Sequence, residues 1–173
     1  REFGLVQLER SGQSAAVRHV HAAAMLAFCE ASAEGFWHKE FRFWQADRID
    51  TDLQNIRAAL AWAAELGDDG AEIGMRLSGP LWNYWQTRGR ITEGRAYIDD
   101  WAFRPGQQAW CLSGNLPGLA FLCWIQGDDA RCQEVVTAGL AVTAGTYFHS
   151  FRAMLFLVMA LMEFRKGLEN VFT

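Results

Sequence analysis

The chain of 173 residues carries 16 Lys and Arg residues against 20 Asp and Glu residues, a formal net charge of −4 at pH 7. Such a balance lacks the basic patch that grips nucleic acid, so it excludes direct DNA or RNA binding by this segment. Hydrophobic residues make up 51% of the chain, which suffices for one buried core that needs no disulfide bonds.

The chain opens with residues that favour a helical tail. Residues 1–12 read as the end of a preceding junction helix, which the Ser11-Gly12 pair terminates. Apolar residues then recur at helical spacing with almost no strand-like alternation, so we predict an all-α protein. A helix over residues 14–33 is expected to bury a stripe made of Val17, Val20, Ala24, Phe28 and Ala31.

Two further helices are predicted in the N-terminal part, residues 13–66. A short one over residues 38–48 carries Phe41 and Trp44 on one face. A separate amphipathic helix follows over residues 51–66, with Asp50 or Thr51 as its N-cap and Gly67 as its left-handed C-terminal residue.

Regular glycine punctuation marks residues 67–173. Helices are predicted over residues 71–88, 92–103, 107–126, 129–144 and 148–166, and Gly89, Gly127 and Gly167 end three of them. These glycines recur at a spacing of about 40 residues, which is typical of stacked helical hairpins. We therefore predict an α-solenoid. Because proline removes a helical hydrogen bond, Pro117 predicts a break near Asn115-Leu116.

Two tryptophans three residues apart, Trp82 and Trp85, lie on one helical face in the stretch "LWNYWQTRGRITEGRAY". We expect this face to pack on the next helix, with Gly94 allowing close approach; the expected contacts on that helix are Tyr97, Ile98 and Trp101. An aromatic ligand-binding box is the alternative interpretation.

Three stretches resemble a known family. "DLQNIRAALAWAAELGD", "LWNYWQTRGRITEGRAYIDDW" and "LAFLCWIQGDDARCQEVVTAGLAV" are similar to the tetratricopeptide-like sensor region of large LuxR-type and related STAND signalling ATPases. The resemblance is strongest at Asn55, Arg57, Leu81, Trp82, Trp85, Arg88, Gly89, Glu93, Gly94, Arg95 and Gly127-Asp128. It implies a sensor segment that binds a protein or small-molecule inducer and acts on neighbouring ATPase and DNA-binding domains.

The resemblance also implies where contacts are made. Ala120 and Cys132 would fill the small-residue positions where paired helices touch. The first helices of successive hairpins would line a concave binding surface. Carried over by repeat position, its residues are Arg76, Asn83, Gln86, Thr87, Phe121, Trp124 and Ile125. The alternative is that these side chains pack on neighbouring repeats or domains.

Candidate chemistry is sparse. No phosphate-binding G-x-x-x-x-G-K-[ST] loop occurs, and His19 and His21 point about 200° apart on a helix, so they cannot share a metal ion. Acidic pairs beside the turn glycines are explained as helix caps. We expect no enzyme, no metal and no cofactor.

The cysteines and the termini bear on compartment. The thiols lack C-x-x-C spacing and lie on apolar stretches, which predicts buried reduced residues in a cytoplasmic protein; they are Cys29, Cys111, Cys123 and Cys132. There is no signal-peptide pattern, and the apolar run over residues 153–162 is shorter than the roughly 20 residues that span a membrane.

Two functions remain open at this stage. The first is a sensor segment of a LuxR-type STAND transcriptional regulator. The alternative is a tetratricopeptide-like scaffold or adaptor, attached to a signalling enzyme such as a cyclase or kinase, or acting alone. The helix over residues 148–164 is apolar nearly all round, so we expect another element or a second copy, in a homodimer, to cover it.

Overall fold

The structure is a computed structural model that describes residues 12–35, 42–105 and 107–172, and every regular element in these ranges is a helix. The all-α prediction is therefore confirmed. The elements are α2 (Ser14–Gly35), α3 (Arg42–Glu65), the 3-10 helix η2 (Gly67–Gly70), α4 (Ala71–Ser78), the 3-10 helix η3 (Gly79–Leu81), α5 (Trp82–Thr87), α6 (Ile91–Ala102), α7 (Ala109–Ile125), α8 (Asp129–Val142) and α9 (His149–Phe172).

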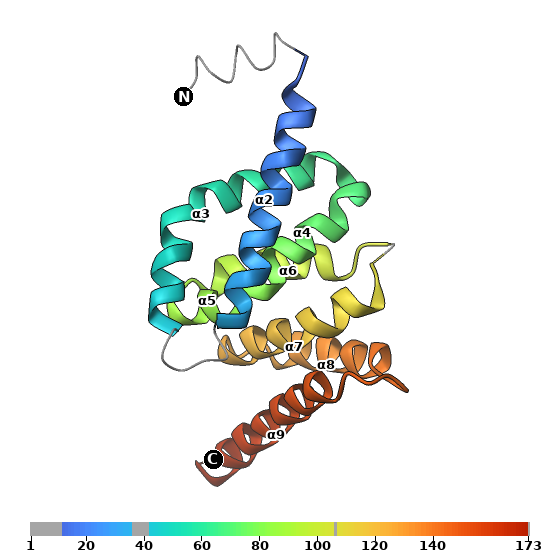
Figure 1. The fold of residues 1–173 in the computed structure, drawn as a ribbon. Coiled ribbons are helices and arrows are strands. Elements are labelled where there is room, and N and C mark those ends of the chain that lie inside the picture. Colours follow the sequence, from blue (N-terminus) through green and yellow to red (C-terminus); the bar gives the residue numbers. More distant parts are fainter. Residues whose placement is uncertain (1–11, 36–41, 106, 173) are drawn as a thin grey trace.

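Helices that follow one another in the chain pack against one another. α2 packs on α3, α4 and α5 on α6, and α7 on α8, while α2 also contacts α4, α4 and α5 contact α7, and α7 contacts α9. We call α2, α4 with α5, α7 and α9 the first-helix row. The second helices α3, α6 and α8 each contact two successive members of this row, and the chain descends from α2 to α9 in Figure 1.

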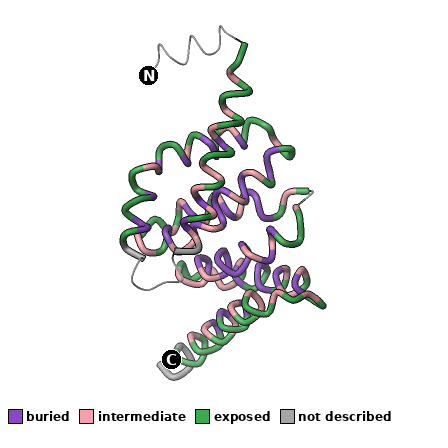
Figure 2. Tube along the Cα trace, viewed as in Figure 1, coloured by how far each residue is buried: buried purple, intermediate pink, exposed green. Residues whose placement is uncertain are grey.

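The core follows these contacts. Its largest buried side chains include Trp85, Trp101 and Tyr84. Figure 2 shows buried residues concentrated along the helices in the middle of the molecule, whereas the start of α2 and much of α9 are exposed. The thiols of all four cysteines are buried and unpaired, as the sequence predicts.

Local turn chemistry was predicted well. Gly67, Gly89 and Gly127 all have a positive φ, of 62°, 66° and 75°, a conformation that glycine adopts without the steric cost a side chain would bring. Each follows a helix. Gly167 is different, because α9 continues through it to Phe172, so the predicted helix end at Gly167 is wrong.

The buried face of α2 differs from the predicted stripe. Val17 and Val20 are 44% and 71% exposed, whereas Ala22, Cys29 and Ser32 are buried. The apolar period was correct for a helix, but the contact face is chosen by the positions of α3 and α4. Alanines of α2 itself lie on most sides of the helix, so its hydrophobic pattern did not define one face.

The predicted boundary between two helices near residue 50 is also wrong. α3 runs without interruption from Arg42, and Thr51 Oγ1 donates to the carbonyl of Asp47 one turn earlier instead of capping. The Asp50 carboxylate accepts a hydrogen bond from Tyr84 Oη at 2.6 Å. Both polar side chains are thus hydrogen-bonded while they lie inside a continuous helix, so neither acts as an N-cap.

Two proline-containing segments depart from expectation. The predicted 71–88 helix is divided by η3, where Pro80 follows Gly79 and a Cβ on Gly79 would lie 2.0 Å from Asn115 Oδ1. By contrast α7 is continuous through Pro117, so the predicted break near Asn115-Leu116 is wrong. Burial of the surrounding apolar side chains offsets the cost of about 3 kcal/mol that an internal proline carries.

The expected junction helix over residues 1–12 lies outside the described residues apart from Gly12. So does the beginning of the expected 38–48 helix, including Phe41. Trp44, on the first turn of α3, is 54% exposed.

Candidate partner-binding site

The predicted tryptophan face separates into two contacts. Trp85 is fully buried against α6: its ring lies 6.1 Å from that of Tyr97, and a Cβ on Gly94 would lie 2.1 Å from its Cγ. The close approach expected at Gly94 is confirmed. Trp82 instead packs on α7, with its ring 5.6 Å from that of Phe121. Both tryptophans are therefore engaged in helix packing.

A cavity of about 330 Å³ opens where members of the first-helix row converge, and we call it the Trp110 cavity. α2, α4, η3, α7 and the start of α9 all contribute to it. Its lining residues are Glu30, Arg76, Pro80, Trp110, Cys111, Gly114, Asn115, Phe148 and Phe151. Because these come from distant parts of the chain, only the tertiary fold creates the cavity.

An ion pair closes one side of the Trp110 cavity. Arg76 Nε donates to Glu30 Oε1 at 2.8 Å, and Arg76 Nη1 donates to Glu72 Oε1 at 3.4 Å. The hydrogen bond to Glu30 is the main cause that raises the pKa of Arg76, so the guanidinium stays charged. Its centre lies 5.5 Å from the ring of Trp110, a cation–π distance.

Aromatic rings also line the Trp110 cavity. Phe148 and Phe151 stand with ring centroids 6.0 Å apart, and Trp110 is 49% exposed. Gly114 faces Phe151, whose Cζ would lie 3.7 Å from a Cβ at that position. A Cβ here would therefore make an ordinary van der Waals contact with the Phe151 ring.

The thiol of Cys111 lies in the lining but is not an activated nucleophile. Burial, followed by the negative charge of Glu72, raises its pKa to about 11, against a partial lowering by Arg76. Since the thiolate is the reactive form, this cysteine stays protonated and inert at neutral pH.

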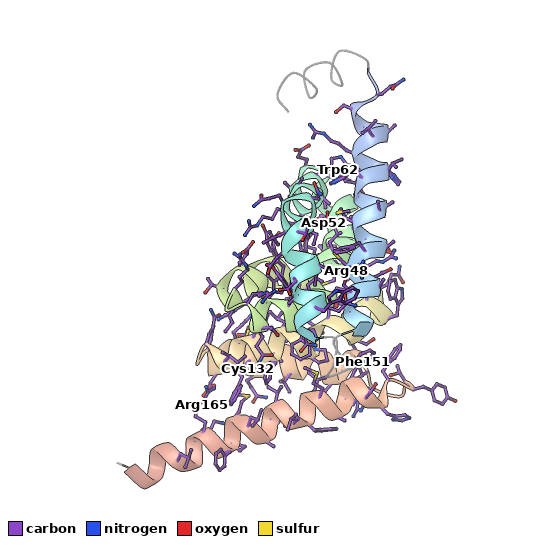
Figure 3. The ribbon with its side chains drawn as sticks, turned by 60° about the vertical axis from the view of Figure 1, so that its left-hand side comes forward. Arg48, Asp52, Trp62, Cys132, Phe151 and Arg165 are labelled. Atoms are coloured by element: carbon purple, nitrogen blue, oxygen red, sulfur yellow. The ribbon has the colours of Figure 1, made fainter. Side chains whose placement is uncertain are left out.

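A second cavity, of about 280 Å³, shares Arg76 with the first. Its other lining residues are His19, Ala22, Ala23, Leu26, Trp62 and Ile73, from α2, α3 and α4. The rings of His19 and Trp62 stack 6.0 Å apart. Figure 3 labels Trp62, from the second cavity, and Phe151, from the Trp110 cavity, and the two lie far apart along the molecule. Arg76 lines both cavities.

The residues predicted to line a concave binding surface do not share one site in the structure. Arg76 lines both cavities. The others line neither: Asn83, Gln86, Thr87, Phe121, Trp124 and Ile125. Phe121 and Trp124 stack at 5.6 Å. Arg165 of α9 donates to the Trp124 carbonyl at 2.7 Å and lies 5.4 Å from its ring, so here the packing alternative describes the contacts.

Sequence reasoning missed Glu30, Trp110, Phe148 and Phe151. Trp110 belongs to the first turn of α7, and Phe148 immediately precedes α9. A search for aromatic residues at the starts of the predicted helices over residues 107–126 and 148–166 would have found both.

Other kinds of site were searched for in the same structure. Within residues 12–35, 42–105 and 107–172, no group of three or more His, Cys, Asp or Glu side chains is placed to hold a metal ion. In the same ranges, each helix falls short of the combined length and apolar character needed to cross a bilayer. No protein-family model matches the chain, and neither a curated protein nor a solved structure does.

Proposed function

We propose that this chain is a non-enzymatic binding segment, an α-solenoid of tetratricopeptide-like hairpins that serves as the sensor of a LuxR-type STAND transcriptional regulator. The observation that carries this proposal is the Trp110 cavity, which takes its lining from successive members of the first-helix row. In helical-repeat proteins that row forms the concave face on which ligands dock.

The α7–α8 hairpin supports the repeat architecture. Cys132 Sγ lies 3.3 Å from the carbonyl of Ala120, and both residues are fully buried where the resemblance expects small side chains. Gly127 makes the turn, and the Asp128 carboxylate caps α8 by accepting a hydrogen bond from the backbone N–H of Arg131 at 3.1 Å.

The second helices are joined to one another in a repeated manner. Arg57 of α3 donates to both carboxylate oxygens of Glu93 in α6, at 2.7 and 2.8 Å. Arg131 of α8 pairs with Asp99 of α6, with Nε donating at 3.1 Å. Each pair links consecutive second helices, which fits a stack of similar units.

In this proposal the segment senses and does not catalyse. An inducer that binds one arrangement of the helices better than another shifts the population of the two states. The coupling then passes to the ATPase and DNA-binding modules that the resemblance implies. Arg76 is suited to such a role because it joins α2 to α4 at the cavity.

Reading the coding sequence on both sides of this segment tests the regulator assignment. We expect a P-loop ATPase module upstream and a helix-turn-helix domain at one end of the full chain. A cyclase or kinase domain in their place would instead support the scaffold alternative. Flanking sequence with none of these domains would contradict the sensor proposal and leave an adaptor acting alone.

The exposed side of α9 favours self-association as part of the same proposal. Phe156, Leu157, Phe164 and Leu168 are between 45% and 66% exposed on this helix. We expect light scattering to report a homodimer, and Phe164→Glu to shift it toward the monomer. A monomer at every concentration would argue against this contact.

A further inference from the structure

The charges and rings of the Trp110 cavity point to one class of ligand. Building on the proposed binding role of this surface, we propose that the cavity takes a small organic cation: an ammonium group carried on an apolar body. The ammonium would lie beside Glu30, and the apolar body would lie among Trp110, Phe148 and Phe151.

The first argument is the balance of charge. Two carboxylates share the single guanidinium of Arg76: Glu30, which lines the cavity, and Glu72, which lies outside the lining. Their side chains are 40% and 46% exposed, against 30% for Arg76, so both carboxylates keep an accessible side. The group therefore carries one net negative charge, which a bound cation would neutralise.

Beyond the effect of burial, the same two carboxylates raise the pKa of the Cys111 thiol, which lines the cavity. After burial, Glu72 is the next cause that raises the pKa of its thiol, and Glu30 adds to it, whereas Arg76 alone among the named charges lowers it. Both carboxylates thus act on the lining in addition to contacting Arg76.

The second argument is the aromatic wall. Ring faces attract cations, and ammonium ligands are often held among several rings. Arg76 already uses the ring of Trp110 in this manner, at 5.5 Å. Phe148 and Phe151, whose ring centroids are 6.0 Å apart, add further ring surface to the lining.

The third argument is size. A volume of about 330 Å³ lies in the range of small-molecule sites, which are mostly apolar with few polar groups. Pro80 and Gly114 supply apolar or open lining here. An anionic ligand is disfavoured, because it would lie beside the Glu30 carboxylate and would compete with it for Arg76.

Titration calorimetry with three probes that share one apolar body tests this inference. The probes are 4-phenylbutylamine, 4-phenylbutanol and 4-phenylbutyrate, so that only the charge of the head group changes. We expect the amine to bind about tenfold more tightly than the alcohol, and the carboxylate to bind weakest. Equal affinity for amine and alcohol, or tightest binding of the carboxylate, would overturn the inference.

Glu30→Gln assigns the effect to the cavity. This variant keeps a hydrogen-bond acceptor for Arg76 but removes the charge, so the preference for the amine should fall to less than about threefold. Glu65→Gln is the matched control, since Glu65 pairs with Arg18 of α2 at 2.6 Å outside the cavity. An unchanged preference in Glu30→Gln, or an equal loss in the control, counts against the site.

Trp110→Leu provides a second variant, which removes an aromatic ring and leaves the Glu30 carboxylate in place. The half-exposed ring can be replaced with little effect on folding, and the amine should lose more affinity than the alcohol. Failure of all three probes to bind overturns the cation inference but leaves the sensor proposal to the flanking sequence. Binding of the carboxylate that Trp110→Leu abolishes would keep the cavity as a site and change its ligand class.

Discussion

The α7–α8 hairpin and α9 are both rich in apolar residues, yet they are buried very differently. In α7 the side chains of Leu116, Leu119 and Leu122 are at most 1% exposed. On α9 the side that carries Leu155, Val158 and Met162 is buried. Other apolar side chains of this helix, such as Leu157, are exposed. α7 has α4, α5, α6, α8 and α9 as neighbours, whereas α9 packs mainly on α7 and α8. Apolar composition makes a helix suitable for burial, but the number of neighbours determines how much of it is buried.

Alkaline pH should have the largest effect on stability, and it acts on the α7–α8 hairpin, which holds three of the buried thiols, whereas α9 carries no cysteine. Burial raises the pKa of Cys111 and Cys132 to about 11 and that of Cys123 to about 12, and these thiols lie in α7 and α8. Cys29 of α2, at about 12, is the fourth. Unfolded thiols ionise near 8.5, so their stabilising effect is complete below that pH and is lost as pH rises toward 11 to 12.

Urea unfolding between pH 7 and pH 10 measures this loss. The free energy of unfolding should fall steadily above about pH 8.5, and less steeply in Cys123→Ala, which has one buried thiol fewer. If the unfolding free energy of the variant fell equally steeply with pH, the buried thiols would not be the cause of the fall.

Paired leucine truncations should sharpen the comparison. Leu119→Ala in α7 removes a fully buried side chain and should cost about 2–5 kcal/mol of unfolding free energy. Leu157→Ala in α9, where the side chain is 56% exposed, should cost less than about 1 kcal/mol. Chemical denaturation of both variants provides the measurement. Similar costs would mean that α9 is covered in solution, as in a dimer.

Paired glycine substitutions should have opposite signs. Gly127→Ala places a side chain at a φ of 75° and should destabilise the hairpin by about 1 kcal/mol. Gly167→Ala falls inside α9, where nothing lies within 4 Å of the added Cβ, and should stabilise by up to about 1 kcal/mol. Thermal unfolding of both proteins tests this. A destabilising Gly167→Ala would argue that α9 ends there, as its sequence predicts.

The smallest expected effect concerns the attachment of α9. Arg165 donates to the Trp124 carbonyl at 2.7 Å and pairs with Asp129 at the start of α8. Arg165→Met keeps the aliphatic stem, so the loss should be about 0.5–1 kcal/mol. Hydrogen exchange should accelerate in α9 but not in α7, and Lys166→Met serves as an exposed control. Faster exchange in both helices would show that they unfold as one unit.

Local sequence determined the helices and most of their turns. Amphipathic spacing predicted the helical class, and the conformational freedom of glycine placed the turns at Gly67, Gly89 and Gly127, because each of these effects acts within a few residues. The contact of Ala120 with Cys132 was expected from the resemblance to tetratricopeptide-like repeats, in which paired helices touch at small side chains.

Tertiary structure decided what local rules left open. Pro117 remained inside α7 and Asp50 inside α3, because packing and distant partners such as Tyr84 outweighed the local tendency to end a helix. The Trp110 cavity depends on Glu30 meeting Arg76, 46 residues later in the chain. Periodicity shows that a residue can face a neighbour, but only the packing of whole helices determines which neighbour it meets.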